Sequence, residues 1–214
     1  HAGPEIAVAS TKAYTAQIVL LNILAMYFAE ILETADPKIL QEMKKDLLEL
    51  PNKLDNILED TNLIIKIAKD IYEKDDMFFL GRGIDYPVAM EGSLKLKEIS
   101  YIHSESYAAG ELKHGPIALI EKSTPVIGFV TLEVVNDATR NNFEEVTTRG
   151  AKVFVISTKS LSRSTDSFVI DDVNEDISSL SLAMISQYLA YFTALEKKTD
   201  IDKPRNLAKS VTVE

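Results

Sequence analysis

The chain has 214 residues, of which 46% are hydrophobic and 26% are charged, and its formal net charge is −10. This length and composition predict a soluble globular protein with one domain of ordinary size and some extra helices. The acidic balance argues against nucleic acid as a partner, because broad phosphate binding needs clustered Lys and Arg. The absence of cysteine excludes disulfides, thiolate metal sites and cysteine nucleophiles, and it permits a reducing compartment.

The first part of the chain predicts consecutive helices. Apolar residues run almost continuously over Ala7–Leu32, and the most apolar stretch is Ile18–Leu32. That stretch contains Asn22 and Glu30 and is shorter than the roughly 20 apolar residues of a membrane span. We therefore expect a buried helix and no membrane span.

A second helix is expected to begin at Asp36-Pro37, because Asp caps helices well and Pro is tolerated in the first turn. Pro51 is expected to interrupt this helical pattern. Apolar residues at helical spacing then continue to Ile71, which predicts further helix.

After Lys74, short apolar runs of strand length alternate with helical segments. Strands separated by helices predict an α/β fold in which helices cover both faces of a parallel sheet, a three-layer α/β/α sandwich preceded by a helical arm. The expected strands are Met77–Leu80, Val126–Val130, Val153–Ile156 and Phe168–Ile170, and the expected helices are Tyr86–Ser100, Ala138–Arg149 and Ile177–Leu195.

The first expected strand ends in Gly81-Arg82-Gly83, and a helix follows. Ligands of open parallel sheets bind beyond the carboxyl ends of the strands, where helix N-termini offer their amides. A dinucleotide fingerprint would need a third glycine where Tyr86 stands. A tight strand-to-helix turn is therefore the simpler interpretation.

Three ionisable side chains share one face of the expected helix Tyr86–Ser100, because Glu91, Lys95 and Glu98 are spaced by four and three residues. Two interpretations stay open. Either this face is exposed and carries two weak salt links, or a carboxylate beside a lysine lies at the mouth of the sheet. The second arrangement suits moving a proton between carbon atoms.

The polar stretch Tyr101–Pro116 predicts a loop, and it contains His103 and His114. Loops rich in ionisable groups often carry function. Each histidine is either an acid or base near neutral pH or an ordinary surface residue. The histidines are not four residues apart on a helix, and no cysteine assists them, so we expect no metal.

Residues 202–214 mix turn residues with apolar ones, unlike a disordered tail. Such a tail could fold back over a pocket and bring Lys209 into it. A desolvated lysine can form a Schiff base with a ketone.

Taken together, four segments resemble the C-terminal part of the glutamine–fructose-6-phosphate aminotransferase (glucosamine-6-phosphate synthase) family. They are Ala2–Gln17 (AGPEIAVASTKAYTAQ), Phe79–Gly83 (FLGRG), Glu91–Ile120 (EGSLKLKEISYIHSESYAAGELKHGPIALI) and Lys203–Glu214 (KPRNLAKSVTVE). The resemblance implies two sugar isomerase (SIS) domains, each a parallel sheet of about five strands between helices. On this basis, residues 1–36 are the remnant of the first SIS domain, 37–65 a helical linker, 66–205 the second SIS domain and 206–214 an active-site tail.

The resemblance also implies a reaction: fructose 6-phosphate and ammonia from glutamine give glucosamine 6-phosphate, without a cofactor, in a cytoplasmic homodimer. By residue match, Glu98 is the base that moves a proton between C1 and C2. His114 serves sugar-ring opening across the dimer, and Lys209 forms the imine. The matching positions of the sugar pocket are Glu5, Val8, Ser10, Lys95 and Ala208.

Two parts of that family have no counterpart in this sequence: the glutaminase domain with its cysteine nucleophile, and the phosphate-binding loop of the first SIS domain. We expect both as partners in a parent chain, and we expect these 214 residues alone to bind the sugar phosphate weakly and not to use glutamine. Two alternatives stay open, a non-catalytic sugar-phosphate-binding SIS regulatory module and a dimerisation scaffold.

Overall fold

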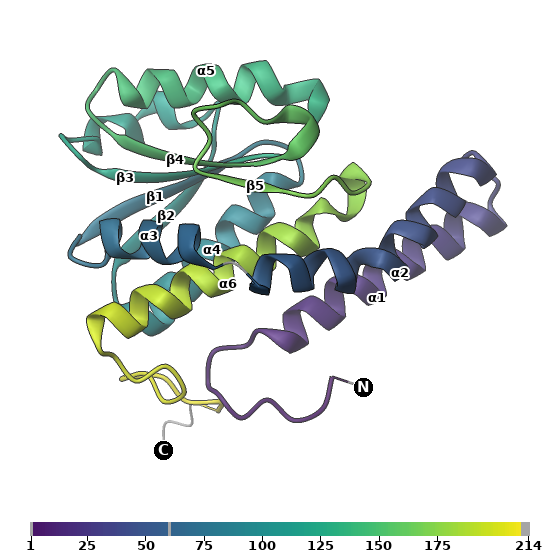
Figure 1. Cartoon of the computed structure of the whole chain (residues 1–214), viewed down its shortest axis with the longest axis horizontal. Helices are drawn as coiled ribbons and strands as arrows, with labels where there is room; N and C mark the ends of the chain where they lie inside the picture. The colour runs from purple at the N-terminus through teal and green to yellow at the C-terminus, as the bar shows by residue number, and fades with distance from the viewer. Residues whose placement is uncertain (1, 60, 211–214) are drawn as a thin grey trace.

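A computed structural model describes residues 2–59 and 61–210 of the chain. Five parallel strands form one sheet in the order β2-β1-β3-β4-β5 (Figure 1). The strands are β1 (Asp76–Gly81), β2 (His103–Ala108), β3 (Pro125–Val130), β4 (Lys152–Thr158) and β5 (Phe168–Ile170). This arrangement confirms the expected parallel sheet, and the four strands foreseen from apolar runs all form.

Helices cover both faces of this sheet, so the three-layer α/β/α sandwich is confirmed. Helices α3, α4 and α6 lie on one face, and α5 lies on the other (Figure 1). The helices are α1 (Lys12–Ile31), α2 (Pro37–Glu59), α3 (Asn62–Ile71), α4 (Asp85–Ser100), α5 (Asn136–Thr147) and α6 (Ser178–Lys197).

The strands lack polar alternation because both of their faces are buried. In β1, Phe79 packs under α3, α4 and α6, whereas its neighbours Phe78 and Leu80 pack on the side of α5. Gly92 lets α4 approach closely, since a Cβ there would lie 2.9 Å from both the Phe79 ring and the Ser186 hydroxyl. These contacts fix α4, which carries the candidate site, against the sheet.

The stretch expected as a loop contains strand β2, so that prediction is wrong for His103–Ala108. β2 is an edge strand, and among the described residues it pairs only with β1. An edge strand needs little apolar burial on its outer side, which hides it from a search for apolar runs. Its buried Ser104 is instead fixed to α4, exchanging hydrogen bonds with Ser93 at 2.7 and 2.8 Å.

The expected interruption at Pro51 does not occur, because α2 runs through it without a break. Proline removes one backbone hydrogen bond from a helix interior. Leu50 is buried and Leu47 and Leu54 are partly buried in one cluster with α1 and the start of α6. This packing on the turns around the proline outweighs the lost bond.

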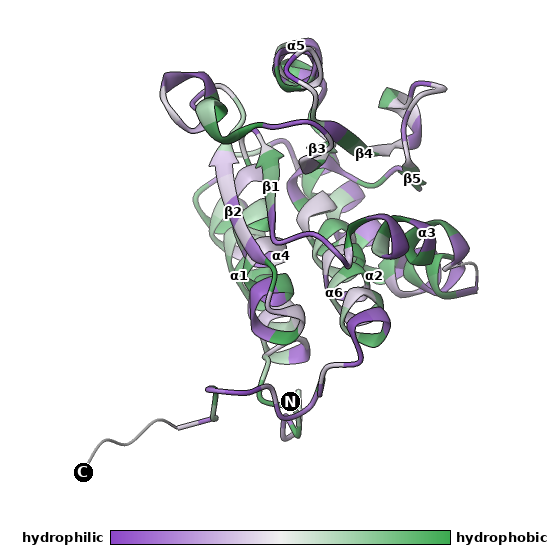
Figure 2. Ribbon diagram, turned by 90° about the vertical axis from the view of Figure 1, so that its left-hand side faces the viewer, coloured by the Kyte–Doolittle hydropathy of each residue, from purple (hydrophilic) through white to green (hydrophobic). Residues whose placement is uncertain are grey.

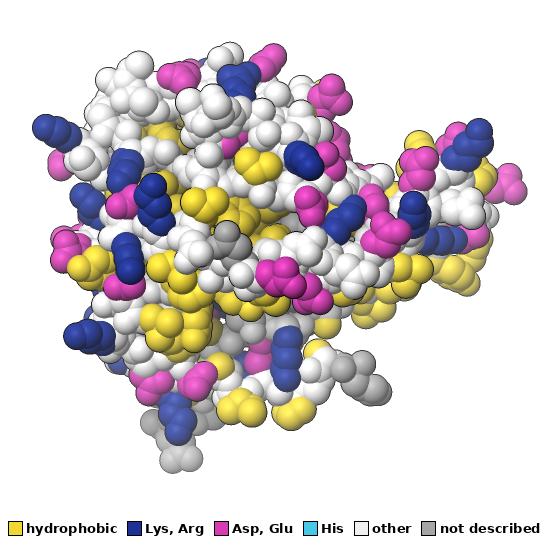
Figure 3. All heavy atoms as spheres, viewed as in Figure 1, with side chains coloured by type: hydrophobic (Ala, Val, Ile, Leu, Met, Phe, Trp, Pro, Cys, Tyr) yellow, Lys and Arg dark blue, Asp and Glu magenta, His cyan; other side chains and the backbone are white. Residues whose placement is uncertain are grey.

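The expectation that Ile18–Leu32 is buried is also wrong within this chain. Of the residues in α1 only Met26 is buried, and Leu21 and Phe28 are 59% and 54% exposed. Hydrophobic side chains therefore gather along the arm formed by α1 and α2 (Figure 3). By length and composition α1 could cross a membrane, a test that core helices of soluble proteins also pass.

Candidate active site

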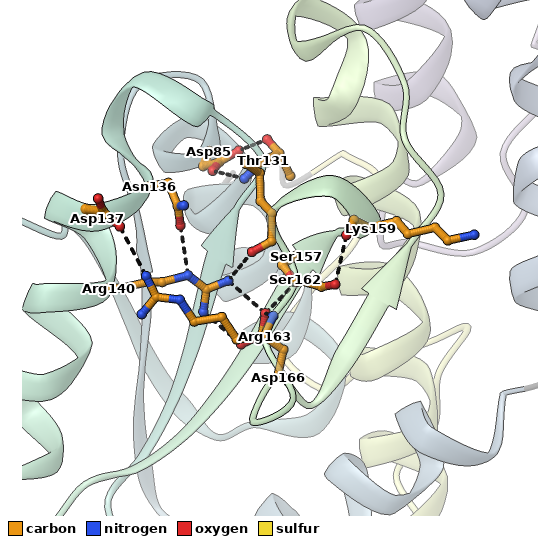
Figure 4. Close-up of polar contacts among 11 residues, drawn as sticks. Asp85, Thr131, Asn136, Asp137, Arg140, Ser157, Lys159, Ser162, Arg163 and Asp166 are labelled. Carbon is orange, nitrogen blue, oxygen red and sulfur yellow. Dashed lines mark hydrogen bonds and ion pairs between the residues drawn. The ribbon is translucent and has the colours of Figure 1, made fainter.

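The carboxyl ends of the strands, where sheets of this kind usually bind ligands, are occupied by the chain's own carboxylates. Asp85, at the start of α4, is 1% exposed and accepts hydrogen bonds from the amide and the hydroxyl of Thr131 (Figure 4). Glu175 accepts from the amide of Glu133 at 2.7 Å. Asp172 accepts from the amide of Ser160 at 2.9 Å. The amides that could hold a phosphate at these three positions are therefore already satisfied.

Burial raises the pKa of Asp85 to about 6, although both bonds from Thr131 lower it. The Gly81-Arg82-Gly83 segment beside it is a tight turn, since a Cβ on Gly81 would lie 2.6 Å from the backbone of Asp85. Arg82 is bound to Asn142 at 2.9 Å. The turn interpretation is therefore confirmed.

A buried ion pair nearby ties α5 to the loop after β4 (Figure 4). Arg140 donates two hydrogen bonds of 2.8 Å to Asp166, whose side chain is fully buried. Burial raises the pKa of Asp166, but the bonds from Arg140 and Ser157 outweigh it and hold the pKa below its usual value. This pair fixes the framework at the carboxyl end, and the sequence pattern gave no sign of it.

The ionisable face of α4 is buried, so the interpretation as an exposed face is wrong. The Lys95 ammonium lies 2.6 Å from Glu98 and 3.6 Å from Glu91, and its side chain is 5% exposed. Burial raises the pKa of Glu91; Lys95 opposes this shift and the Glu98 charge adds to it. A lysine held between two carboxylates is a suitable proton-transfer group.

This group lies at the opposite end of the sheet from the expected mouth. α4 starts beside the carboxyl end of β1 and runs back, so that Lys95 and Glu98 lie toward the start of β2. Figure 2 shows β1 and β2 pointing away from the end at which the N-terminal segment and the tail lie. The prediction of a site at the carboxyl ends is therefore wrong for these two residues.

The tail folds back, and it brings Lys209 to the segment that precedes α1. The Lys209 ammonium donates to the carbonyl of Val8 at 3.0 Å and lies 3.9 Å from the Glu5 carboxylate. Glu5 accepts further hydrogen bonds from the hydroxyl of Ser10 at 2.8 Å and from the amide of Thr11 at 2.5 Å. Four sequence-predicted residues, namely Glu5, Val8, Ser10 and Lys209, therefore meet.

The surroundings of Glu5 favour the ionised form of its carboxylate. Burial raises its pKa, but hydrogen bonds from Thr11 and Ser10 and the charge of Lys209 outweigh burial, so that the pKa lies below its usual value. The described tail is exposed at Ala208, and residues 211–214 of the expected tail lie outside the described residues.

A cavity of about 220 Å³ connects the tail-binding segment with α4. Ala7 and Ala9, which flank Val8, form one wall, and Lys95 forms part of another. Glu98 is not among the lining residues, but it contacts Lys95, which is. The remaining lining residues are Thr11, Ile99, Gln187, Tyr191, Ile201 and Asp202.

Sequence reasoning missed the contribution of α6 to this cavity. Thr11, Gln187 and Tyr191 also line a wider groove of about 390 Å³, together with Tyr188. A glutamine between apolar helix turns was a signal that could have marked this face of α6. Within the described ranges, no group of three His, Asp or Glu side chains could hold a metal ion.

His114 does not join the other predicted residues. It ends a short 3-10 turn (Leu112–His114) that follows the carboxyl end of β2, and its side chain is exposed. Lys95 and Glu98 lie at the other end of the sheet. One chain therefore does not bring His114 and Glu98 together.

The SIS domain family model matches residues 70–197. The chain is 53% identical, over its whole length, to a glutamine–fructose-6-phosphate aminotransferase of Clostridium tetani and 50% identical to the Staphylococcus aureus enzyme of the same name. It spans only 36% and 35% of the length of those relatives. Their names describe longer proteins.

Solved structures show the same fold. The chain superposes on the C-terminal domain of a glucosamine-fructose-6-phosphate aminotransferase from Francisella tularensis with a TM-score of 0.88 and 36% identity. That match covers 94% of this chain and 58% of the other. A glucosamine-6-phosphate deaminase from Thermotoga maritima, at 24% identity and a TM-score of 0.73, shares the fold.

Proposed function

Because this chain belongs to the SIS domain family, we propose that it is the sugar-converting part of a glutamine–fructose-6-phosphate aminotransferase. In this proposal, Lys209 forms an imine with open-chain fructose 6-phosphate, and Glu98 moves a proton between C1 and C2. Ammonia replaces the lysine at C2, so the product is glucosamine 6-phosphate. The observation that carries the proposal is the contact of Lys209 with Val8, whose neighbours Ala7 and Ala9 line the same cavity as Lys95.

The chemistry needs each of these groups. The Lys209 amine attacks the ketone carbon, and the ketone oxygen leaves as water. The positive imine nitrogen acidifies the neighbouring C–H bond, because it accepts the electron pair that the proton leaves behind. Ammonia then displaces the Lys209 amine at C2, so that the sugar carries the nitrogen of the product and the lysine is free again. Glu98 takes the proton from C1 and returns it to C2, while the C1 hydroxyl loses its proton and becomes the aldehyde carbonyl. Lys95 holds the Glu98 carboxylate from 2.6 Å and lines the cavity.

The proposed substrate carries a phosphate, and this chain offers it little. The amides of Thr131, Glu133 and Ser160 at the carboxyl end already bind carboxylates. We infer that the first SIS domain of a longer protein holds the phosphate. His114, at the far end of the sheet from Glu98, would reach the site only from a second copy of the chain.

The exposed apolar face of α1 fits the same organisation. We propose that residues 1–36 complete the first SIS domain, 37–65 form a linker, 66–205 form the second SIS domain, and the tail begins at residue 206. The exposed side chains of α1, among them Leu20, Leu21 and Phe28, would then be covered by the rest of the first domain.

Borohydride trapping in the full-length protein tests this function. Reduction in the presence of fructose 6-phosphate should attach the sugar to Lys209, and Lys209→Arg should abolish the adduct. Glu98→Gln should still form the adduct but lose conversion by a factor of about 100 or more, as expected for a general base. Binding of the sugar without any adduct would instead indicate a regulatory module.

A further inference from the structure

Tyr101, which ends the helix that carries Glu98, has an unusual backbone conformation. Its φ is +62° and its ψ is 14°, in the left-handed region. Glycine or asparagine usually takes this position at a helix end, because a Cβ is unfavourable there. A bulky aromatic residue at this point therefore directs attention to what its side chain does.

The Tyr101 side chain holds the segment that leads into the tail in two ways. Its hydroxyl oxygen accepts a hydrogen bond from the backbone amide of Arg205 at 2.8 Å. The guanidinium of Arg205 lies 4.2 Å from the centre of the tyrosine ring. That separation is well within the range of a cation–π contact. One side chain thus binds both the backbone and the side chain of Arg205, the residue that immediately precedes the tail.

Tyr101 follows Glu98 by three residues, and Arg205 precedes Lys209 by four. A second attachment lies earlier in the chain, just after α6, where the hydroxyl of Thr199 donates to the carbonyl of Ile99 at 2.5 Å. The end of α4 therefore carries the proposed base and also holds the segment that leads to the proposed imine lysine. Between Arg205 and Lys209, no described residue forms a further hydrogen bond with α4 or with Tyr101. The contact with Arg205 is therefore the attachment nearest to Lys209 in the chain.

We propose that Tyr101 is a positioning residue, which sets the Lys209 amine relative to the Glu98 carboxylate by fixing Arg205. The inference rests on the proposed function and extends it to a residue that touches neither the sugar nor the reacting atoms. Loss of the hydroxyl should slow the formation of the imine and its exchange with ammonia, because the lysine samples more positions. Sugar binding elsewhere in the cavity should change little.

The test compares Tyr101→Phe and Tyr101→Ala with Tyr72→Phe in the full-length protein. Tyr72 is a matched control, since it also follows a helix end, but it has a right-handed backbone and its hydroxyl binds the adjacent Glu73. Tyr101→Phe should lower the rate of borohydride trapping and kcat about three- to tenfold, the value of one hydrogen bond, with KM nearly unchanged. Tyr101→Ala should lower them further, and Tyr72→Phe should match the unaltered protein.

Amide hydrogen exchange supplies a readout that does not depend on the chemistry, because Tyr101→Phe should speed exchange at Arg205. If Tyr101→Phe traps the sugar at the full rate while Lys209→Arg forms no adduct, the positioning role is wrong and the proposed function stands. If the unaltered protein forms no adduct at Lys209, the proposed function and the positioning role both fail. A loss of thermal stability with full trapping would identify a merely structural role.

Discussion

The two ends of the sheet differ in what their ionisable groups do. At the carboxyl end, Asp85, Asp172 and Glu175 each accept a hydrogen bond from a backbone amide of the neighbouring loops. At the amino end, Lys95 lines a cavity, and the returning tail brings Lys209 to Val8, which lies between two residues that line the same cavity. Ligands of open parallel sheets usually bind at the carboxyl end. In this domain the candidate group of Lys95 and Glu98 lies at the other end, which is not where the fold alone would place a site.

The largest expected effect concerns Lys95 and the two carboxylates, Glu91 and Glu98, that it contacts. Lys95→Met would leave two carboxylates facing each other with side chains only 9% and 21% exposed. Removing one partner of a buried ion pair costs about 3–5 kcal/mol. Urea unfolding of the chain at pH 7 should show a loss of this size.

Lys45→Met is the matched control, because Lys45 pairs with Glu49 at the same helical spacing but is 72% exposed. Its loss should be below about 1 kcal/mol. Equal losses of unfolding free energy in Lys95→Met and Lys45→Met would mean that water solvates Lys95 and its carboxylates. The two ends of the sheet would then not differ in this respect.

Asp85 tests the carboxyl end. Its pKa is raised from 3.8 to about 6 by burial, so the folded state binds its proton more tightly than the unfolded state does. The stability from this group is fully present below about pH 3.8 and is lost as the pH rises through about 6. At 1.36 kcal/mol per pKa unit, the loss is about 3 kcal/mol.

Asp85→Asn removes this titration. The free energy of unfolding of the variant, measured relative to the unaltered chain, should therefore rise between pH 4 and pH 7 by up to that amount. Urea unfolding at several pH values checks it. A constant difference across this range would show that Asp85 is not held in a desolvated position.

How far the sequence predicts this structure depends on which residues carry the signal. Strands buried on both faces, such as β3, are apolar throughout and were foreseen. β2 was not, since an edge strand with a buried hydrogen-bonded serine resembles a loop. Pro51 predicted a helix end that does not form. Here the tertiary packing of Leu50 outweighs the local tendency of proline to end a helix.

For the candidate site, the spacing of Lys95 and Glu98 predicts that they share one helix face. The spacing does not reveal whether that face is buried. The roles of Glu98, His114 and Lys209 came from resemblance to a family. The contact of Lys209 with Val8 joins residues 201 positions apart, and no local pattern encodes it. The carboxylates that fill the carboxyl end likewise meet their amides only after the chain has folded.

The smallest expected effect belongs to Glu5, which titrates in the opposite direction from Asp85. Its pKa lies below 4.5, because hydrogen bonds at the start of α1 and the charge of Lys209 favour the ionised form. Stability from this group is therefore present above about pH 4.5 and is lost as the pH falls through the lowered pKa.

Glu5→Gln keeps the side-chain shape but removes the negative charge at the helix N-terminus, which should cost about 0.5 kcal/mol at pH 7. Chemical unfolding should show this difference shrinking in acid, where Asp85→Asn behaves oppositely. The stability differences of Glu5→Gln and Asp85→Asn from the unaltered chain would contradict this if they changed in the same direction with pH. In that case the two ends of the sheet do not hold their acids in contrasting environments.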